Sequence, residues 1–191
     1  MKKVIVIGAS GSLAKSVIEA VKPLESIKIT LFLRNKNRIS KELSNDCEIF
    51  EGDALNFDDI KKAVSGQDIV YVNLEGNLEW MTENIVKAMQ ELGVRRIIAI
   101  SSIGIYETPL KPVLVPYRKL ADIIEKSGLD YTILRPDWFT NIDEVDYTLT
   151  KKDQQETGSA ISRKSIADFV SKLVNNPNLY VNENLGISKP D

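Results

Sequence analysis

The chain of 191 residues carries a formal net charge of −2 and is 43% hydrophobic and 27% charged. That length suits one domain with a substantial core, and it is too short for a cofactor domain plus a large separate substrate domain. The mild charge excludes the basic surface of a nucleic-acid-binding protein, and no apolar run is long enough to span a membrane. The absence of histidine excludes Ser–His–Asp and Cys–His catalysis, and we expect no metal site.

The single cysteine, Cys47, cannot form an internal disulfide, which is typical of a reducing compartment. Met1-Lys2-Lys3 leads straight into an apolar run, so we expect neither a signal peptide nor a membrane partner. The sequence therefore predicts a cytoplasmic protein that acts on a small-molecule substrate. Whether the chain forms a homodimer is left open.

The N-terminal stretch combines a strand, a glycine turn and a helix. The β-branched run at residues 4–7 ends in Gly8, and a stripe of apolar residues follows at helical spacing: Leu13, Ala14, Val17, Ile18 and Val21. Gly8 permits a tight turn, and Gly11 lets the backbone approach a pyrophosphate at the positive end of the helix. Ala14 takes the place of the third glycine in this GxxGxxA spacing, and it is small enough for close helix–strand packing. The stretch predicts a dinucleotide site.

Strands and helices then alternate along the chain. Apolar runs predict further strands at residues 27–33, 47–50, 68–74, 97–100 and 131–134. Helices are expected at about 57–64, 81–92, 117–126 and 164–175. The alternation predicts an α/β protein: a Rossmann-type doubly wound parallel sheet of order 3-2-1-4-5-6 with helices on both faces. We expect a single domain over 1–191, with a small substrate-side part at about 136–191.

In such a sheet the ligand lies beyond the carboxyl ends of the strands. The residues at these ends are turn-like or polar, and we expect them to meet in one crevice. As cofactor-binding candidates they are Gly8, Ser10, Gly11, Ser12, Leu13, Arg34, Asp53, Ala54, Leu74, Glu75, Gly76 and Pro136.

Three of these positions have a specific interpretation and an alternative. Arg34 stands where an acidic residue would bind the ribose of NAD, so its charge favours the 2′-phosphate of NADP over NAD; alternatively, it is a solvated surface charge. Asp53 either accepts a bond from the adenine or orients the turn before the next helix. Gly76 either lets the chain pass close to the cofactor or makes a simple turn.

Ser101, Ser102 and Tyr117 are the candidates for catalysis. In a reductase, a serine at the end of the fifth strand binds a substrate carbonyl or a catalytic tyrosine. Alternatively, it is simply a polar residue at the end of a strand and has no role in catalysis. Proton donation by a phenol requires a cation nearby. Tyr117 and Lys119 are two positions apart and do not share a helix face, so the evidence for an acid is weak.

The sequence resembles the atypical short-chain dehydrogenase/reductases of the NmrA-like, NAD(P)-binding type. The stretches that carry the likeness are GASGSLAKSV at 8–17, LFLRN at 31–35, GDALNFDDIKKAV at 52–64, RRIIAISSIGIY at 95–106, SGLDYTILRPDWFTN at 127–141 and SRKSIADFV at 162–170. The resemblance implies a Rossmann fold and cofactor contacts at the glycine turn, Arg34, Asp53, Ala54, the loop after the fourth strand and Pro136. Trp138, Phe139 and Tyr106 are expected either to wall a small apolar substrate pocket or to pack in the core, as aromatic residues more often do.

Typical members of that group carry a Tyr-x-x-x-Lys pair, and this chain has none at the expected place. Three functions follow as hypotheses. The first is an NADPH-dependent oxidoreductase of a small carbonyl, quinone or flavin-like substrate. The second is a non-catalytic NADP-binding redox sensor that regulates a partner. The third is a sugar-nucleotide epimerase or dehydratase, against which the short segment after Pro136 argues.

Overall fold

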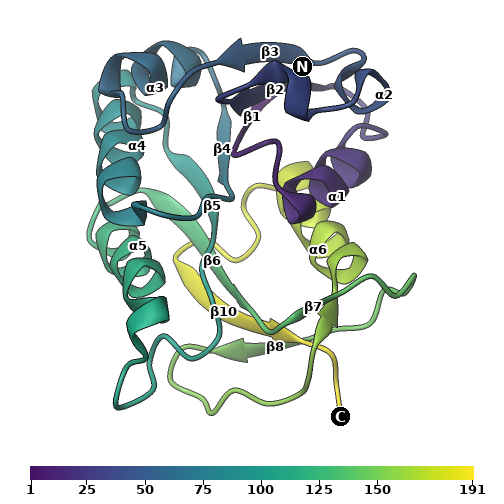
Figure 1. Ribbon diagram of the computed structural model, residues 1–191, viewed down its shortest axis with the longest axis vertical. Coiled ribbons are helices and arrows are strands. Elements are labelled where there is room, and N and C mark those ends of the chain that lie inside the picture. Colours follow the sequence, from purple (N-terminus) through teal and green to yellow (C-terminus); the bar gives the residue numbers. More distant parts are fainter.

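An eight-stranded sheet runs through the centre of the computed structural model, which describes all residues 1–191. The strand order is β3-β2-β1-β4-β5-β6-β10-β8, with helices on both faces (Figure 1). The first six strands in this order confirm the predicted 3-2-1-4-5-6 arrangement and pair in parallel. They are β1 (Lys2–Ile7), β2 (Ile27–Leu33), β3 (Glu48–Glu51), β4 (Ile69–Val72), β5 (Arg96–Ile100) and β6 (Asp130–Pro136).

Alternation of side chains along the strands divides the core between the two faces of the sheet. In β1, Val4 and Val6 face one cluster while Ile5 and Ile7 face the other. The first face is covered by α1 (Ser12–Val21), the short α2 (Lys41–Ser44) and α6 (Arg163–Asn175). The second is covered by α3 (Phe57–Val64), α4 (Leu78–Leu92) and α5 (Val115–Glu125) (Figure 1). None of these helices combines the length and apolarity needed to cross a bilayer.

The C-terminal part adds two strands that the sequence pattern did not predict. β10 (Glu183–Ser188) pairs in parallel with β6, and β8 (Thr148–Lys151) pairs antiparallel at the sheet edge. β8 is rich in threonine and lysine, and β10 contains Asn184 and Gly186, so neither has the apolar run of a central strand. Two further short strands, β7 (Phe139–Thr140) and β9 (Ile161–Ser162), form a separate parallel pair.

Capping residues set the ends of several helices. Asn56 caps α3 through its side chain, and Ser162 caps α6 in the same way. α4 begins three residues before its predicted start because Asn77 accepts a hydrogen bond from the Trp80 N–H. It ends at Gly93, which adopts φ +71°.

Candidate cofactor site

The glycine turn between β1 and α1 is built on backbone contacts. The N–H groups of Gly8 and Ala9 both donate to the Phe32 carbonyl, at 3.0 and 3.1 Å. Gly8 has φ +92°, and a Cβ on it would lie 2.1 Å from the Asn73 carbonyl oxygen. Gly11 has ordinary space, since its nearest neighbours would be 3.4 Å from a Cβ. Only glycine therefore fits at position 8, because the turn passes directly over the backbone at the end of β4.

The backbone N–H groups at the N-terminus of α1 are available to bind an anion. No side chain caps it, and its first turn contains no acidic residue. The N–H groups of Ser10, Ser12 and Leu13 have no hydrogen-bond partner within the protein. Leu13 itself is buried, so only its backbone faces outward. Free donors at the positive end of a helix fit the pyrophosphate of a dinucleotide.

Arg34 follows β2 and is exposed. It forms no ion pair with any carboxylate of the chain, so its charge is available to a ligand. The following residues make a short 3-10 helix, Lys36–Arg38, which Asn35 caps through its side chain. The nearby Glu51 carboxylate accepts from the Lys36 backbone N–H at 2.9 Å.

Asp53 and Ala54 follow β3. The Asp53 carboxylate accepts from the Leu55 N–H at 3.0 Å, which is the turn-forming role that the sequence allowed as the alternative. Its second carboxylate oxygen has no partner within the protein and stays available to a ligand. Ala54 is buried, and its carbonyl accepts from the Asn84 side chain at 3.0 Å. Ala54 therefore closes the core beneath the turn.

The loop after β4 lies next to the glycine turn. The Leu74 side chain would be 3.1 Å from a Cβ on Gly8, so Leu74 packs directly over the turn. Glu75 and Gly76 are exposed, and Gly76 has φ +95° with no atom within 4 Å of the place where a Cβ would lie. Gly76 is thus required by its backbone conformation, and no protein atom crowds it. Asn73, which the sequence did not single out, forms the floor of the turn.

The three catalytic candidates meet at the end of β5, but they do not form an acid. Ser101 is buried, and its hydroxyl donates to the Tyr117 backbone carbonyl at 3.0 Å instead of contacting the phenol. Ser102 donates to the carbonyl of the next residue, Ile103, at 3.2 Å. Burial raises the pKa of Tyr117, and the negative charge of Glu75 raises it further. Tyr117 is therefore a weaker acid than a free phenol.

The cations beside Tyr117 are engaged elsewhere. Lys119 pairs with Glu79 on α4, and Arg118 pairs with Asp122 at 3.0 Å within α5. The other phenol of this region, Tyr106, accepts a hydrogen bond from Asn184 at 2.8 Å, and burial also raises its pKa. The site as a whole offers no acidified tyrosine.

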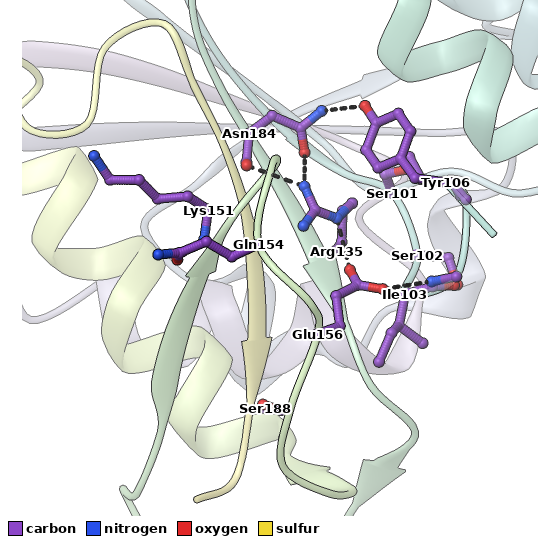
Figure 2. A network of polar contacts seen from close by, with 12 residues as sticks. Ser101, Ser102, Ile103, Tyr106, Arg135, Lys151, Gln154, Glu156, Asn184 and Ser188 are labelled. Carbon is purple, nitrogen blue, oxygen red and sulfur yellow. Dashed lines mark hydrogen bonds and ion pairs between the residues drawn. The ribbon is translucent and has the colours of Figure 1, made fainter.

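A buried polar network lies behind the two serines (Figure 2). The Arg135 guanidinium is 1% exposed and donates to Glu156 at 2.7 Å and to the Asn184 side chain at 2.6 Å. The second oxygen of Glu156 accepts from the Gly104 N–H at 3.0 Å. Figure 2 shows Asn184 linking Arg135 to Tyr106, so the end of β6, the loop after β5 and β10 are tied together.

Pro136 is buried at the end of β6, and its carbonyl accepts from the Ile103 N–H at 3.1 Å. The aromatic wall expected from Tyr106, Phe139 and Trp138 is not formed. Tyr106 packs against the core on the α5 side, whereas Phe139 lies under Arg163 of α6, and Trp138 is 82% exposed. Phe139 belongs to the separate β7–β9 pair, whereas Tyr106 lies in the loop after β5, so the two rings belong to different parts of the fold.

The open glycine turn, at the carboxyl edge of a sheet of order 3-2-1-4-5-6, defines a Rossmann-type dinucleotide-binding protein. A family model described as NAD(P)H-binding matches residues 8–177. A Rossmann-fold NAD(P)-binding family protein from Shigella flexneri is 41% identical, with a TM-score of 0.91 over 100% of this chain and 94% of that chain.

Two more distant structures share the fold. A short-chain dehydrogenase/reductase from Veillonella parvula in complex with NADP is 23% identical, with a TM-score of 0.89 over 99% of this chain and 95% of that chain. ChuY, an anaerobilin reductase from Escherichia coli O157:H7, is 19% identical, with a TM-score of 0.82 over 100% of this chain and 98% of that chain.

The chain belongs to the NAD(P)H-binding family. The predicted resemblance to atypical short-chain dehydrogenase/reductases and the predicted NAD(P) cofactor are thereby confirmed. Gly8, the uncapped start of α1 and the unpaired Arg34 fit that cofactor in this structure. The NmrA-like subgroup stays a prediction.

Proposed function

We propose that this protein is an NADPH-dependent reductase of a small quinone, carbonyl or flavin-like substrate. The observation that carries the proposal is the pairing of an anion cradle at Gly8–Leu13 with an unpaired Arg34 and two serines at the end of β5. When bound, NADPH supplies a hydride. The chain contributes the orientation of cofactor and acceptor, because positioning alone accelerates a reaction between two bound molecules.

The missing acid favours acceptors that need no proton before hydride transfer. The Ser101 hydroxyl donates its hydrogen bond to the Tyr117 carbonyl, and the raised pKa of Tyr117 makes its phenol a weak acid. A quinone or a flavin ring takes up a hydride and delocalises the resulting charge, and the proton then arrives from water. A simple ketone develops an alkoxide and gains more from a proton donor.

The direct test is NADPH oxidation against a panel of quinones, flavins and aldehydes. We expect turnover with quinones or flavins and little with aldehydes. Tyr117→Phe serves as the matched variant, because it removes only the phenol oxygen. We expect it to retain most of the activity, and a complete loss would assign Tyr117 as the proton donor. Absence of turnover with every acceptor would overturn the reductase proposal.

Arg34 provides a separate prediction about cofactor choice. Arg34→Asp should weaken NADPH binding about tenfold to a hundredfold, because a charge-assisted contact to the 2′-phosphate contributes roughly 1.5–3 kcal/mol. NADH lacks that phosphate, so its affinity should change little. Fluorescence titration of both cofactors measures the ratio. Lys62→Glu, an equal reversal of an exposed charge on α3, is the control, and equal losses for both cofactors would refute the assignment.

A non-catalytic redox sensor is the second candidate, and the engagement of Ser101 by the helix backbone favours it. A sensor must bind NADP and NADPH with different affinities, because a ligand shifts a conformational equilibrium only through differential binding. Equal dissociation constants for the two redox forms would exclude this function.

A further inference from the structure

Arg163, the first residue of α6, reaches the glycine turn from the far end of the chain. Its Nε donates to the Ser12 hydroxyl at 3.2 Å, across 151 positions of sequence. Its Nη1 donates to the Asn141 side chain at 2.8 Å, and its guanidinium lies 5.0 Å from the centre of the Phe139 ring. Phe139 and Asn141 thus hold the guanidinium beside Ser12, which begins α1.

The charge of Arg163 is not compensated by the protein. Its hydrogen-bond partners, a hydroxyl and an amide, are both neutral. The other buried or half-buried arginines near the site have carboxylate partners: Arg118 binds Asp122 and Arg135 binds Glu156. Arg163 is half-buried and has none.

Two helix dipoles make this position still more positive. Arg163 lies at the N-terminus of α6 and contacts the N-terminus of α1, and neither helix has an acidic residue in its first turn. A cation at a helix N-terminus is unfavourable because that end carries a partial positive charge. A half-buried guanidinium between two such ends is therefore stabilised most by an anion that binds there.

We propose that Arg163 is a cofactor-binding residue that pairs with the bridging phosphates of NADP. This inference rests on the proposed function, because it takes NADP to be the ligand of the glycine turn. A guanidinium offers two parallel donors to phosphate oxygens, and such pairs are stronger than neutral hydrogen bonds. The guanidinium donors contact Ser12 and Asn141, both of which are neutral partners that a phosphate can replace.

An ion pair between Arg163 and the bridging phosphates would give the C-terminal part of the chain a role in cofactor binding. α6, β7 and β9 come from the segment after β6, yet they place a charge at the turn formed by the first fourteen residues. The purely structural alternative is that Arg163 only fastens α6 to α1. The two roles predict different losses of affinity. If Arg163 only holds α6 against α1, its removal weakens every ligand of the site; if it binds the bridging phosphates, its removal weakens only ligands that contain them.

The test compares ligands with and without bridging phosphates, using calorimetric titration of the full chain. Arg163→Ala should raise the dissociation constant of NADP about tenfold to a hundredfold. It should leave binding of adenosine 2′-phosphate, which lacks the bridging phosphates, unchanged. Arg163→Lys should lose less than Arg163→Ala because it keeps the charge. Lys164→Ala is the matched control, since this neighbouring cation is already paired with Asp143 at 2.5 Å.

Each outcome decides between the proposals. Equal weakening of NADP and adenosine 2′-phosphate, or no weakening of either, would overturn the assignment of Arg163 while leaving the reductase proposal intact. Selective loss of NADP affinity in a protein that reduces no acceptor would support Arg163 and overturn the reductase alone. A wild-type protein that binds no NADP would overturn both.

Discussion

Replacement of Gly8 by alanine is expected to lower the free energy of unfolding by about 2–6 kcal/mol and to abolish NADP binding. Two costs combine. The backbone at φ +92° is strained for any residue with a side chain, and the new Cβ would meet the Asn73 carbonyl oxygen at 2.1 Å. That oxygen belongs to the backbone at the end of β4, so relief requires the turn or the strand end to move. Urea denaturation followed by circular dichroism measures the loss.

Gly76→Ala separates the two costs. Gly76 has nearly the same dihedral, φ +95°, but no atom lies within 4 Å of its Cβ position. We expect it to lose only the conformational part, about 1–3 kcal/mol. Equal destabilisation by Gly8→Ala and Gly76→Ala would show that the contact with Asn73 is unimportant.

Gly11→Ala separates folding from binding at the same turn. Its Cβ would make ordinary contacts at 3.4 Å, and its φ of −69° suits alanine. The variant should unfold like the wild type and bind NADP less tightly, because the added methyl group stands where a pyrophosphate approaches the backbone.

Loss of Glu156 is expected to destabilise the protein by about 3–5 kcal/mol, because it leaves the Arg135 guanidinium buried without a counter-charge. Arg135 is 1% exposed and Glu156 only 19% exposed, so water screens this pair little. Glu156→Ala also frees the Gly104 N–H, which follows Ser101 and Ser102. Amide hydrogen exchange at Gly104 should therefore accelerate, alongside the loss measured in urea.

The double variant Arg135→Met/Glu156→Ala tests whether charge burial is the cause. Removing the guanidinium as well should restore part of the stability lost in Glu156→Ala, since methionine is apolar and of similar length. If the second substitution instead adds its own full cost, the two residues are not energetically coupled. Glu91→Ala, which breaks the exposed pair with Lys61, should change stability little and controls for ion pairs in general.

Local sequence patterns were sufficient for most of the fold. The apolar run at 4–7, the glycines that follow it and the 3.6-residue stripe of α1 are each read over a few neighbouring residues, and the structure has them where expected. The same holds for β2 and α3, whose bounds match the prediction. Strand order followed because parallel α/β sheets have few allowed topologies.

Features that depend on distant residues could not be read in this way. β8 and β10 lack a continuous apolar run; β10 forms because β6 offers it a free edge, and β8 pairs in turn with the free edge of β10. The Ser101 hydroxyl donates to the backbone carbonyl of Tyr117 on α5, whereas the sequence suggested a substrate carbonyl or a catalytic tyrosine as its partner. Neighbouring residues in the sequence predict which helix or strand a residue belongs to. The direction of its side chain depends on the helices and strands that pack against it in the folded protein.

The glycine turn contains both kinds of information. Its residue types and its place between a strand and a helix are local, and they sufficed to predict a dinucleotide site. The need for glycine at position 8 comes from Asn73, and the charge beside Ser12 comes from Arg163. Both partners reach the turn only when the chain folds, because hydrogen bonding within the sheet and packing of α6 on α1 bring them there.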